Sequence, residues 1–249
     1  MHCRSTVSAL LLFGLATFSS SLPAAAPAGF KEIFNGQDLT GWEGLPFWSV
    51  KAGAIVGQTT PEKPTKGNTF LVYRAGQPAN FELRATFRLT GQNTTGFANS
   101  GIQYRSHVVD AAAFVIGGYQ ADMDLADKYT GMLYEEKGRG ILMAPGEKIR
   151  VGATTMDPAT KKPTTAVEKL PGATPSAELH AAYKVGDWND LVIIAEGNHL
   201  RHVLNGKLTA DVIDNDPTLA AKSGVLALQL HAGQPMTIEF KNLYLKSLP

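Results

Sequence analysis

Apolar and polar residues alternate strictly along several short stretches of the chain. In the clearest stretch, Phe81 to Leu89, the odd-numbered positions are apolar and the even-numbered positions are polar. A period of two residues is typical of a β-strand with one buried and one solvated face. This stretch is therefore predicted to be a strand in a sheet that is packed on one side.

The same signal predicts further strands along the body of the chain, at residues 48–56, 69–73, 101–105, 117–124, 131–135, 191–196, 199–204, 225–231 and 236–245. Helical patterns are short and occur only at residues 175–183 and 217–222, and the Pro-, Thr-, Lys- and Gly-rich residues 144–177 are predicted to form a long irregular loop. Many short strands in one domain favour an all-β fold, a two-sheet jelly-roll sandwich.

The first 28 residues are predicted to be a signal peptide. Arg4 precedes an apolar run from Val7 to Phe18, and Ala26-Pro27-Ala28 matches a small-residue cleavage site. The run is too short for a membrane span, so none is expected. We expect residues 29–249 to form a single domain that is periplasmic or secreted, and its sequence contains no cysteine because Cys3 lies in the leader.

The charge balance excludes nucleic acid as the main partner. The chain carries 23 basic and 22 acidic residues with no long run of either sign, whereas phosphate binding needs a concentrated basic surface. Motifs of a nucleophilic serine, a P-loop, a CxxC pair or an HExxH zinc site do not occur.

Alternation also predicts which polar side chains share a face of their strand. These sets are Gln103 with Arg105, Gln120 with Asp122 and Asp124, and Gln229 with His231. Glu135 and Glu136 end a further strand that could join them. If the strands are neighbours, their polar side chains form a concave surface of the kind that binds sugars.

Simpler interpretations remain open for the same residues. A polar row on a strand is usually its solvated face. Asp122 and Asp124 could hold a divalent cation such as Ca²⁺, since hard cations prefer carboxylate oxygens. The spacing of Asp122, Asp124 and Asp127 also fits the acidic residues of retaining glycosidases on jelly-roll folds, with Asp122 and Asp127 as the catalytic pair. Binding of a carbohydrate without catalysis, as in a lectin, is a further alternative.

Several ordered motifs extend over nearly the whole predicted mature chain. They include Phe34 to Trp42 (FNGQDLTGW), Asn99 to Arg105 (NSGIQYR), Gly118 to Asp122 (GYQAD), Tyr129 to Glu136 (YTGMLYEE), Gly186 to Asn189 (GDWN) and Leu228 to His231 (LQLH). In these motifs the chain resembles the 3-keto-disaccharide hydrolase domain family. The resemblance implies an exported jelly roll of the concanavalin A-like, LamG-like type.

The resemblance also implies an enzyme that cleaves the glycosidic bond of 3-keto-glycosides or 3-keto-disaccharides. A ketone at C3 acidifies the proton on C2. Loss of that proton gives an enolate, which expels the C1 substituent by β-elimination, and water then adds to the unsaturated product. A carbohydrate substrate is the expected partner.

Under this resemblance, four residues are candidates for the chemistry. His231 is the candidate base, because an imidazole both takes and returns protons near neutral pH. Arg105 would face the developing enolate, and Asp122 or Glu135 would protonate the leaving oxygen. The candidate substrate-binding residues are Gln103, Gln120, Asp124, Gln229 and Tyr134. No cofactor is required, although a divalent cation on Asp122 and Asp124 could replace Arg105.

Overall fold

The fold is described by a computed structural model that places residues 26–91 and 96–249. The predicted signal peptide lies outside the described residues except for its last three positions. Within the described ranges, no helix is long and apolar enough to cross a membrane.

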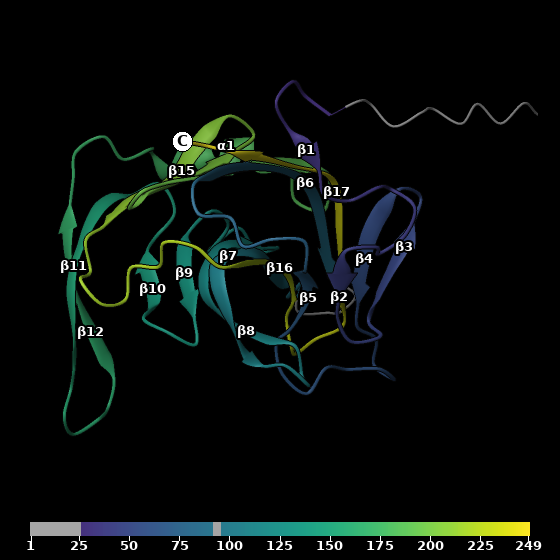
Figure 1. Cartoon of the computed structure of the whole chain (residues 1–249), viewed down its shortest axis with the longest axis horizontal. Helices are drawn as coiled ribbons and strands as arrows, with labels where there is room; N and C mark the ends of the chain where they lie inside the picture. Colours follow the sequence, from purple (N-terminus) through teal and green to yellow (C-terminus); the bar gives the residue numbers. More distant parts are fainter. Residues whose placement is uncertain (1–25, 92–95) are drawn as a thin grey trace, which may run out of the picture.

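Two sheets of mainly antiparallel strands form a sandwich, as predicted (Figure 1). Sheet A has ten strands: β1 (Lys31–Glu32), β3 (Trp48–Lys51), β4 (Ala54–Gln58), β6 (Phe81–Gly91), β11 (Lys148–Met156), β12 (Pro163–Lys169), β13 (Asn189–Glu196), β14 (His199–Leu204), β15 (Lys207–Asp214) and β17 (Met236–Ser247). Sheet B has seven: β2 (Trp42–Glu43), β5 (Thr69–Tyr73), β7 (Asn99–Asp110), β8 (Val115–Asp124), β9 (Leu133–Glu136), β10 (Gly140–Met143) and β16 (Val225–Leu230).

The strand order brings the predicted site strands together. Sheet A runs β12-β11-β15-β14-β13-β6-β17-β4-β3, with β1 beside β17, and sheet B runs β10-β9-β8-β7-β16-β5-β2. In sheet B, β9, β8, β7 and β16 are consecutive neighbours, and these four strands carry most of the polar residues singled out from the sequence. Their side chains can therefore meet on one face of that sheet.

The main core lies between the sheets. The other face of sheet B carries a small apolar cluster on β5, β16 and the start of β8, and polar groups further along β7, β8 and β9. Side chains of sheet B such as Ile102, Ala121 and Leu133 belong to the same buried cluster as Leu83 and Phe87 of sheet A. Because strand residues alternate between faces, their sequence neighbours on β7, β8 and β9 point away from sheet A. We call that side the outer face of sheet B.

Most of the predicted elements are confirmed, and three predictions are wrong. The helix at 175–183 is α1 (Ser176–Ala182), but residues 217–222 contain no helix. Residues 48–56 form two strands, β3 and β4, rather than one. The expected irregular loop at 144–177 contains the β11–β12 hairpin, which projects from the body of the molecule (Figure 1). Its threonines favour strand structure. The Pro and Gly residues of the same segment led to the prediction of a loop.

Candidate functional site

A hollow on the outer face of sheet B gathers the polar residues of several strands. Gln103, Gln120 and Tyr134 lie side by side across β7, β8 and β9, and Gln229 comes from β16. The hollow has a volume of about 200 Å³ and is lined by Asn68, Asn99, Gln120, Asp122, Tyr129, Met132, Tyr134, Glu136, Ile141, Gln229 and His231. Gln103 lies beneath it, because its Nε2 donates to Gln120 Oε1 at 3.3 Å.

Amide side chains hold the two carboxylates of the hollow. Asp122 accepts hydrogen bonds from Gln120 Nε2 at 2.7 Å and from Asn99 Nδ2 at 2.9 Å. Glu136 Oε2 accepts hydrogen bonds from Gln229 Nε2 at 3.2 Å and from Asn68 Nδ2 at 3.4 Å. The residues that line the hollow include no Arg or Lys, and the hydrogen bonds to Asp122 come from neutral amides. Glu136 also has a cation nearby, because the Lys137 ammonium lies 4.0 Å from its Oε1.

Asp122 is a carboxyl group that can exchange a proton near neutral pH. Burial raises its pKa to about 7, against the opposing effect of the hydrogen bonds from Asn99 and Gln120. The negative charges of Asp124 and Glu136 raise it further. A carboxylic acid that is partly protonated at neutral pH can act as a general acid or a general base.

Tyr134 and His231 add a donor and an acceptor to the hollow. Burial and the charges of Glu136 and Asp122 raise the pKa of Tyr134, so its hydroxyl stays protonated and can donate. The Nδ1 of His231 lies 2.5 Å from the carbonyl oxygen of Ala232. That contact requires the proton on Nδ1, which leaves Nε2 as the acceptor in the neutral ring.

Arg105, predicted to face the substrate, lies outside the hollow. The register of β7 against β8 shifts between Tyr104 and His107, and Arg105 has a φ of 46°. This bulge breaks the alternation on which the prediction depended. The guanidinium donates to the carbonyls of Ala79 at 2.8 Å and Gly197 at 2.6 Å, so Arg105 joins loops of the fold.

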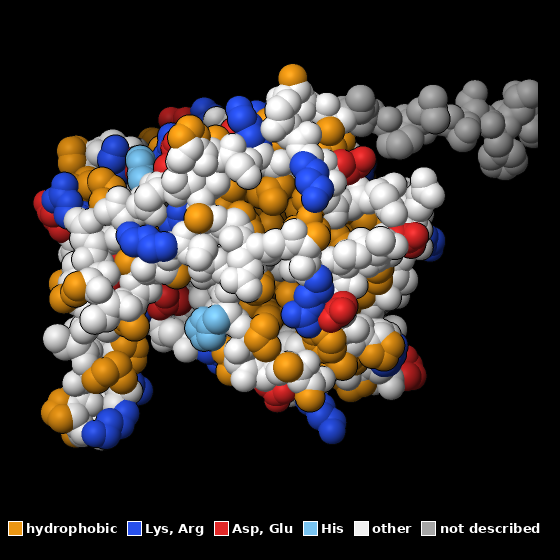
Figure 2. All heavy atoms as spheres, viewed as in Figure 1, with side chains coloured by type: hydrophobic (Ala, Val, Ile, Leu, Met, Phe, Trp, Pro, Cys, Tyr) orange, Lys and Arg blue, Asp and Glu red, His pale blue; other side chains and the backbone are white. Residues whose placement is uncertain are grey.

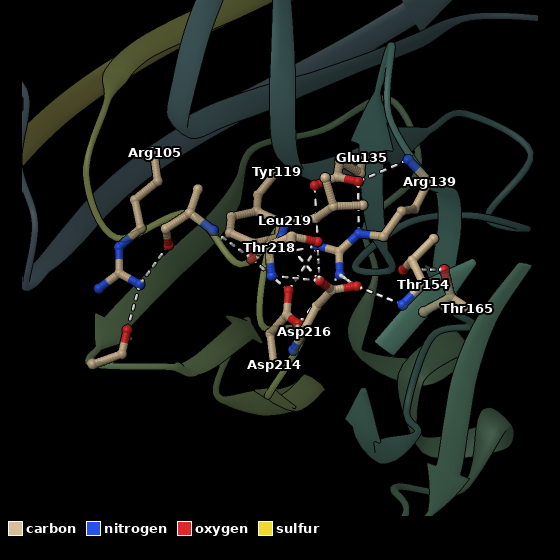
Figure 3. A network of polar contacts seen from close by, with 12 residues as sticks. Arg105, Tyr119, Glu135, Arg139, Thr154, Thr165, Asp214, Asp216, Thr218 and Leu219 are labelled. Atoms are coloured by element: carbon tan, nitrogen blue, oxygen red, sulfur yellow. Dashed lines mark hydrogen bonds and ion pairs between the residues drawn. The ribbon is translucent and has the colours of Figure 1, made fainter. Parts of the chain in front are cut away.

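Glu135 lies on the opposite face of β9, inside the sandwich. Its carboxylate binds Arg139, with Nε at 2.8 Å from Oε2, and Arg139 Nη2 also lies 2.7 Å from Asp214 Oδ2. Figure 3 shows Arg139 between Glu135 and the Asp214–Asp216 pair. The prediction of Glu135 as the proton donor is therefore corrected, because Glu135 serves a buried ion-pair network and the adjacent Glu136 faces the hollow.

The remaining acidic residues of the sequence prediction do not line the hollow. Asp124 turns towards its own loop and accepts the backbone N–H groups of Ala126 and Lys128 at 3.4 and 3.0 Å. Asp127 binds His180 of α1, with Oδ2 2.5 Å from Nδ1, so it does not join Asp122 in the arrangement of a retaining glycosidase. The described part of the chain contains no cluster of three or more His, Cys, Asp or Glu side chains placed to bind a metal.

The sequence prediction missed several residues of the hollow. Asn99 precedes Gly101 and Gln103 by two and four positions, so alternation already placed it on their face. Asn68 comes from the loop before β5, and no periodic signal marks it. The other missed lining residues are Tyr129, Met132 and Ile141.

Comparisons with known proteins agree with this architecture. The family model described as "3-keto-alpha-glucoside-1,2-lyase-like domain" matches residues 29–246. A candidate glycosyl hydrolase from Parabacteroides distasonis ATCC 8503 is 19% identical, with 89% of this chain and 94% of that chain covered and a TM-score of 0.52. The carbohydrate-binding module CBM66 from Bacillus subtilis is 17% identical, with 83% and 96% covered and a TM-score of 0.51. No curated protein matches the chain.

Proposed function

The chain belongs to the family of 3-keto-alpha-glucoside-1,2-lyase-like domains, and we propose that it cleaves the glycosidic bond of 3-keto-glycosides. The family points to a function on carbohydrates, and the hollow on sheet B is the proposed site. The observation that supports the proposal is the buried Asp122 carboxyl, which has a pKa of about 7 and lines the same hollow as His231.

The first step is removal of the C2 proton. His231 takes this proton on Nε2, because its Nδ1 proton is held by the Ala232 carbonyl. The electron pair of the C2–H bond forms the enolate of the C3 ketone. The Tyr134 hydroxyl and the Asn68 amide supply an O–H and an N–H donor for the enolate oxygen, in the role expected of Arg105 from the resemblance.

The second step breaks the bond between C1 and the leaving oxygen. The enolate electrons form the C1–C2 double bond while protonated Asp122 gives its proton to the leaving oxygen. Water then adds its oxygen to C1 and a proton returns to C2, so the net reaction is hydrolysis. Gln120, Gln229 and Glu136 bind the sugar hydroxyls during both steps.

Turnover of a 3-keto-glucoside or 3-keto-trehalose by the purified protein tests this proposal. We expect product to accumulate with time, and His231→Ala to lower the rate by about 10²- to 10⁴-fold. Saturable binding of intact glycans with no product would instead favour a lectin-like domain. Cleavage of glucosides that carry no ketone would favour a conventional glycosidase.

We further propose that residues 29–249 are the mature enzyme and that it acts in the periplasm or as a secreted protein. The support is the predicted signal peptide at residues 1–28. Mass spectrometry of the folded protein from its native cells is expected to give an N-terminus near Gly29. An intact Met1 on that protein would contradict export.

A further inference from the structure

A second cavity adjoins the hollow and shares Asn68 with it. We call it the side pocket, and its volume is about 370 Å³. The Asn68 side chain lies at the boundary, because its Oδ1 accepts the N–H of Ala232 at 3.0 Å and its Nδ2 donates to Glu136 Oε2 at 3.4 Å. The two cavities therefore meet at Asn68, and a ligand that occupied both would pass over this side chain.

The walls of the side pocket are mainly apolar. The apolar lining residues are Leu45, Phe47, Pro64, Ala113 and Val115, from three separate segments of the chain. The other lining residues are Thr65, Lys66, Gly67, Asn68 and Thr69. A second sugar ring presents hydroxyl groups around its edge, and such groups need hydrogen-bond partners when they are buried. A flat apolar ring needs only contact area, so these walls suit it better.

The walls are held together before any ligand arrives. The Lys63 ammonium donates to the Pro46 carbonyl and lies 4.9 Å from the centre of the Phe47 ring. The Thr69 hydroxyl donates to the Ala113 carbonyl at 2.9 Å. These bonds join the three segments, so binding does not have to order them, which favours affinity.

Thr65 gives the side pocket one polar group with no partner in the described structure. Its Oγ1 is buried and makes no hydrogen bond there. A buried hydroxyl without a partner costs free energy that a ligand acceptor would recover. The side pocket therefore fits an aromatic ring that carries a hydrogen-bond acceptor.

We infer that the side pocket binds the aglycone of the substrate and that this aglycone is an aromatic ring. The inference rests on the proposed function, since the β-elimination expels the group attached to C1 and that group must lie beside the sugar. It adds a substrate class, the aryl 3-keto-glucosides, to the reaction assigned to the hollow.

Binding of unreactive ligands tests the side pocket separately from the chemistry. Phenyl and methyl glucosides without the ketone are titrated by calorimetry into the wild-type protein. We expect the phenyl glucoside to bind at least about tenfold more tightly than the methyl glucoside, through the apolar area that it buries. Equal affinities, or no binding of the phenyl glucoside, would overturn the inference.

Two alanines of the same turn provide a matched pair of variants. Ala113→Leu fills the side pocket. It is expected to lower the affinity for phenyl glucoside about tenfold and to leave the affinity for methyl glucoside unchanged. Ala112→Leu makes the same change at an exposed position outside the pocket lining and should alter neither affinity. If Ala113→Leu does not fold, Phe47→Ala replaces it in the test, because it removes one wall of the side pocket and should likewise lower the affinity for phenyl glucoside. An unchanged phenyl preference in the folded variant would contradict the assignment.

Thr65→Val tests the hydroxyl. It is expected to lower the affinity for 4-nitrophenyl glucoside several-fold and to leave the affinity for phenyl glucoside unchanged. Only the nitrophenyl ring carries a group that accepts a hydrogen bond from the Thr65 hydroxyl. Equal effects on both would contradict the Thr65 contact. Turnover of the 3-keto forms is measured in parallel. Turnover without an aryl preference would defeat this inference alone, and an aryl preference without turnover would defeat the proposed function alone.

Discussion

Gly101 of β7 lies against the Gln120 side chain of β8, and a Cβ at position 101 would come within 2.5 Å of Gln120 Cδ. Gln120 is almost fully buried and donates to Asp122. The absence of a side chain at Gly101 therefore lets Gln120 lie flat across the sheet and hold the Asp122 carboxyl in the hollow.

Gly101→Ala is accordingly expected to displace Gln120 and lower kcat/KM, with a loss of about 1–3 kcal/mol in the free energy of unfolding from overpacking. Kinetics and urea unfolding measure the two effects. Gly152→Ala on β11, away from the hollow, is the control and should keep full activity. Wild-type activity in Gly101→Ala would contradict the role given to Gln120.

Glu135 and Glu136 provide a matched test because they are adjacent and face opposite sides of β9. Glu136→Gln should lower kcat/KM by about 10- to 100-fold, the value of a charged hydrogen bond to a sugar hydroxyl, with little change in melting temperature. Glu135→Gln should weaken the Arg139 network and lower stability by about 1–3 kcal/mol, with kcat/KM of the folded protein nearly unchanged. The reverse pattern would show that the faces have been assigned wrongly.

The raised pKa of Asp122 predicts a specific dependence of stability on pH. Its carboxyl titrates at about 7 when folded, against 3.8 for the ordinary group. The folded state keeps the proton that the unfolded state releases, so this contribution to stability is fully present below about pH 4 and is lost as pH rises through about 7. Wild-type melting temperature should therefore fall more between about pH 5 and pH 8 than that of Asp122→Asn. Parallel curves for the two proteins would contradict a raised pKa.

Chelation tests the alternative that Asp122 and Asp124 hold a divalent cation. Both carboxylates already accept hydrogen bonds, Asp122 from Asn99 and Gln120 and Asp124 from backbone N–H groups of its loop. We expect EDTA treatment followed by gel filtration to leave turnover and melting temperature unchanged. Loss of turnover with EDTA and its recovery with Ca²⁺ would assign the electrophilic role to a metal.

Alternation predicted the site where the strands are regular. Gln120, Asp122 and Gln229 line the hollow, with Gln103 directly beneath, because no bulge interrupts β7 between Gly101 and Tyr104 or β8 between Gly117 and Asp124. The same logic failed for Arg105 because a bulge cannot be recognised from the spacing of residues. Alternation also excludes Glu135 from the site, because adjacent residues such as Tyr134 and Glu135 lie on opposite faces of a regular strand.

Other features depend on contacts that no local pattern encodes. Asn68 reaches Glu136 only because the loop before β5 lies against the end of β9. The β11–β12 hairpin joins sheet A through β15, about sixty residues further along the chain. Basic and acidic side chains are interspersed on the face shown in Figure 2.

The most direct measurement of the proposed chemistry is the fate of the C2 hydrogen when a 3-keto-glucoside is cleaved in D₂O. Elimination followed by hydration returns a solvent proton to C2, so we expect initial product to carry deuterium there by NMR, ahead of the spontaneous exchange of product incubated alone. His231→Ala should abolish this rapid incorporation together with turnover. Initial product that retains hydrogen at C2 would contradict proton abstraction and show that the bond is cleaved by direct displacement at C1.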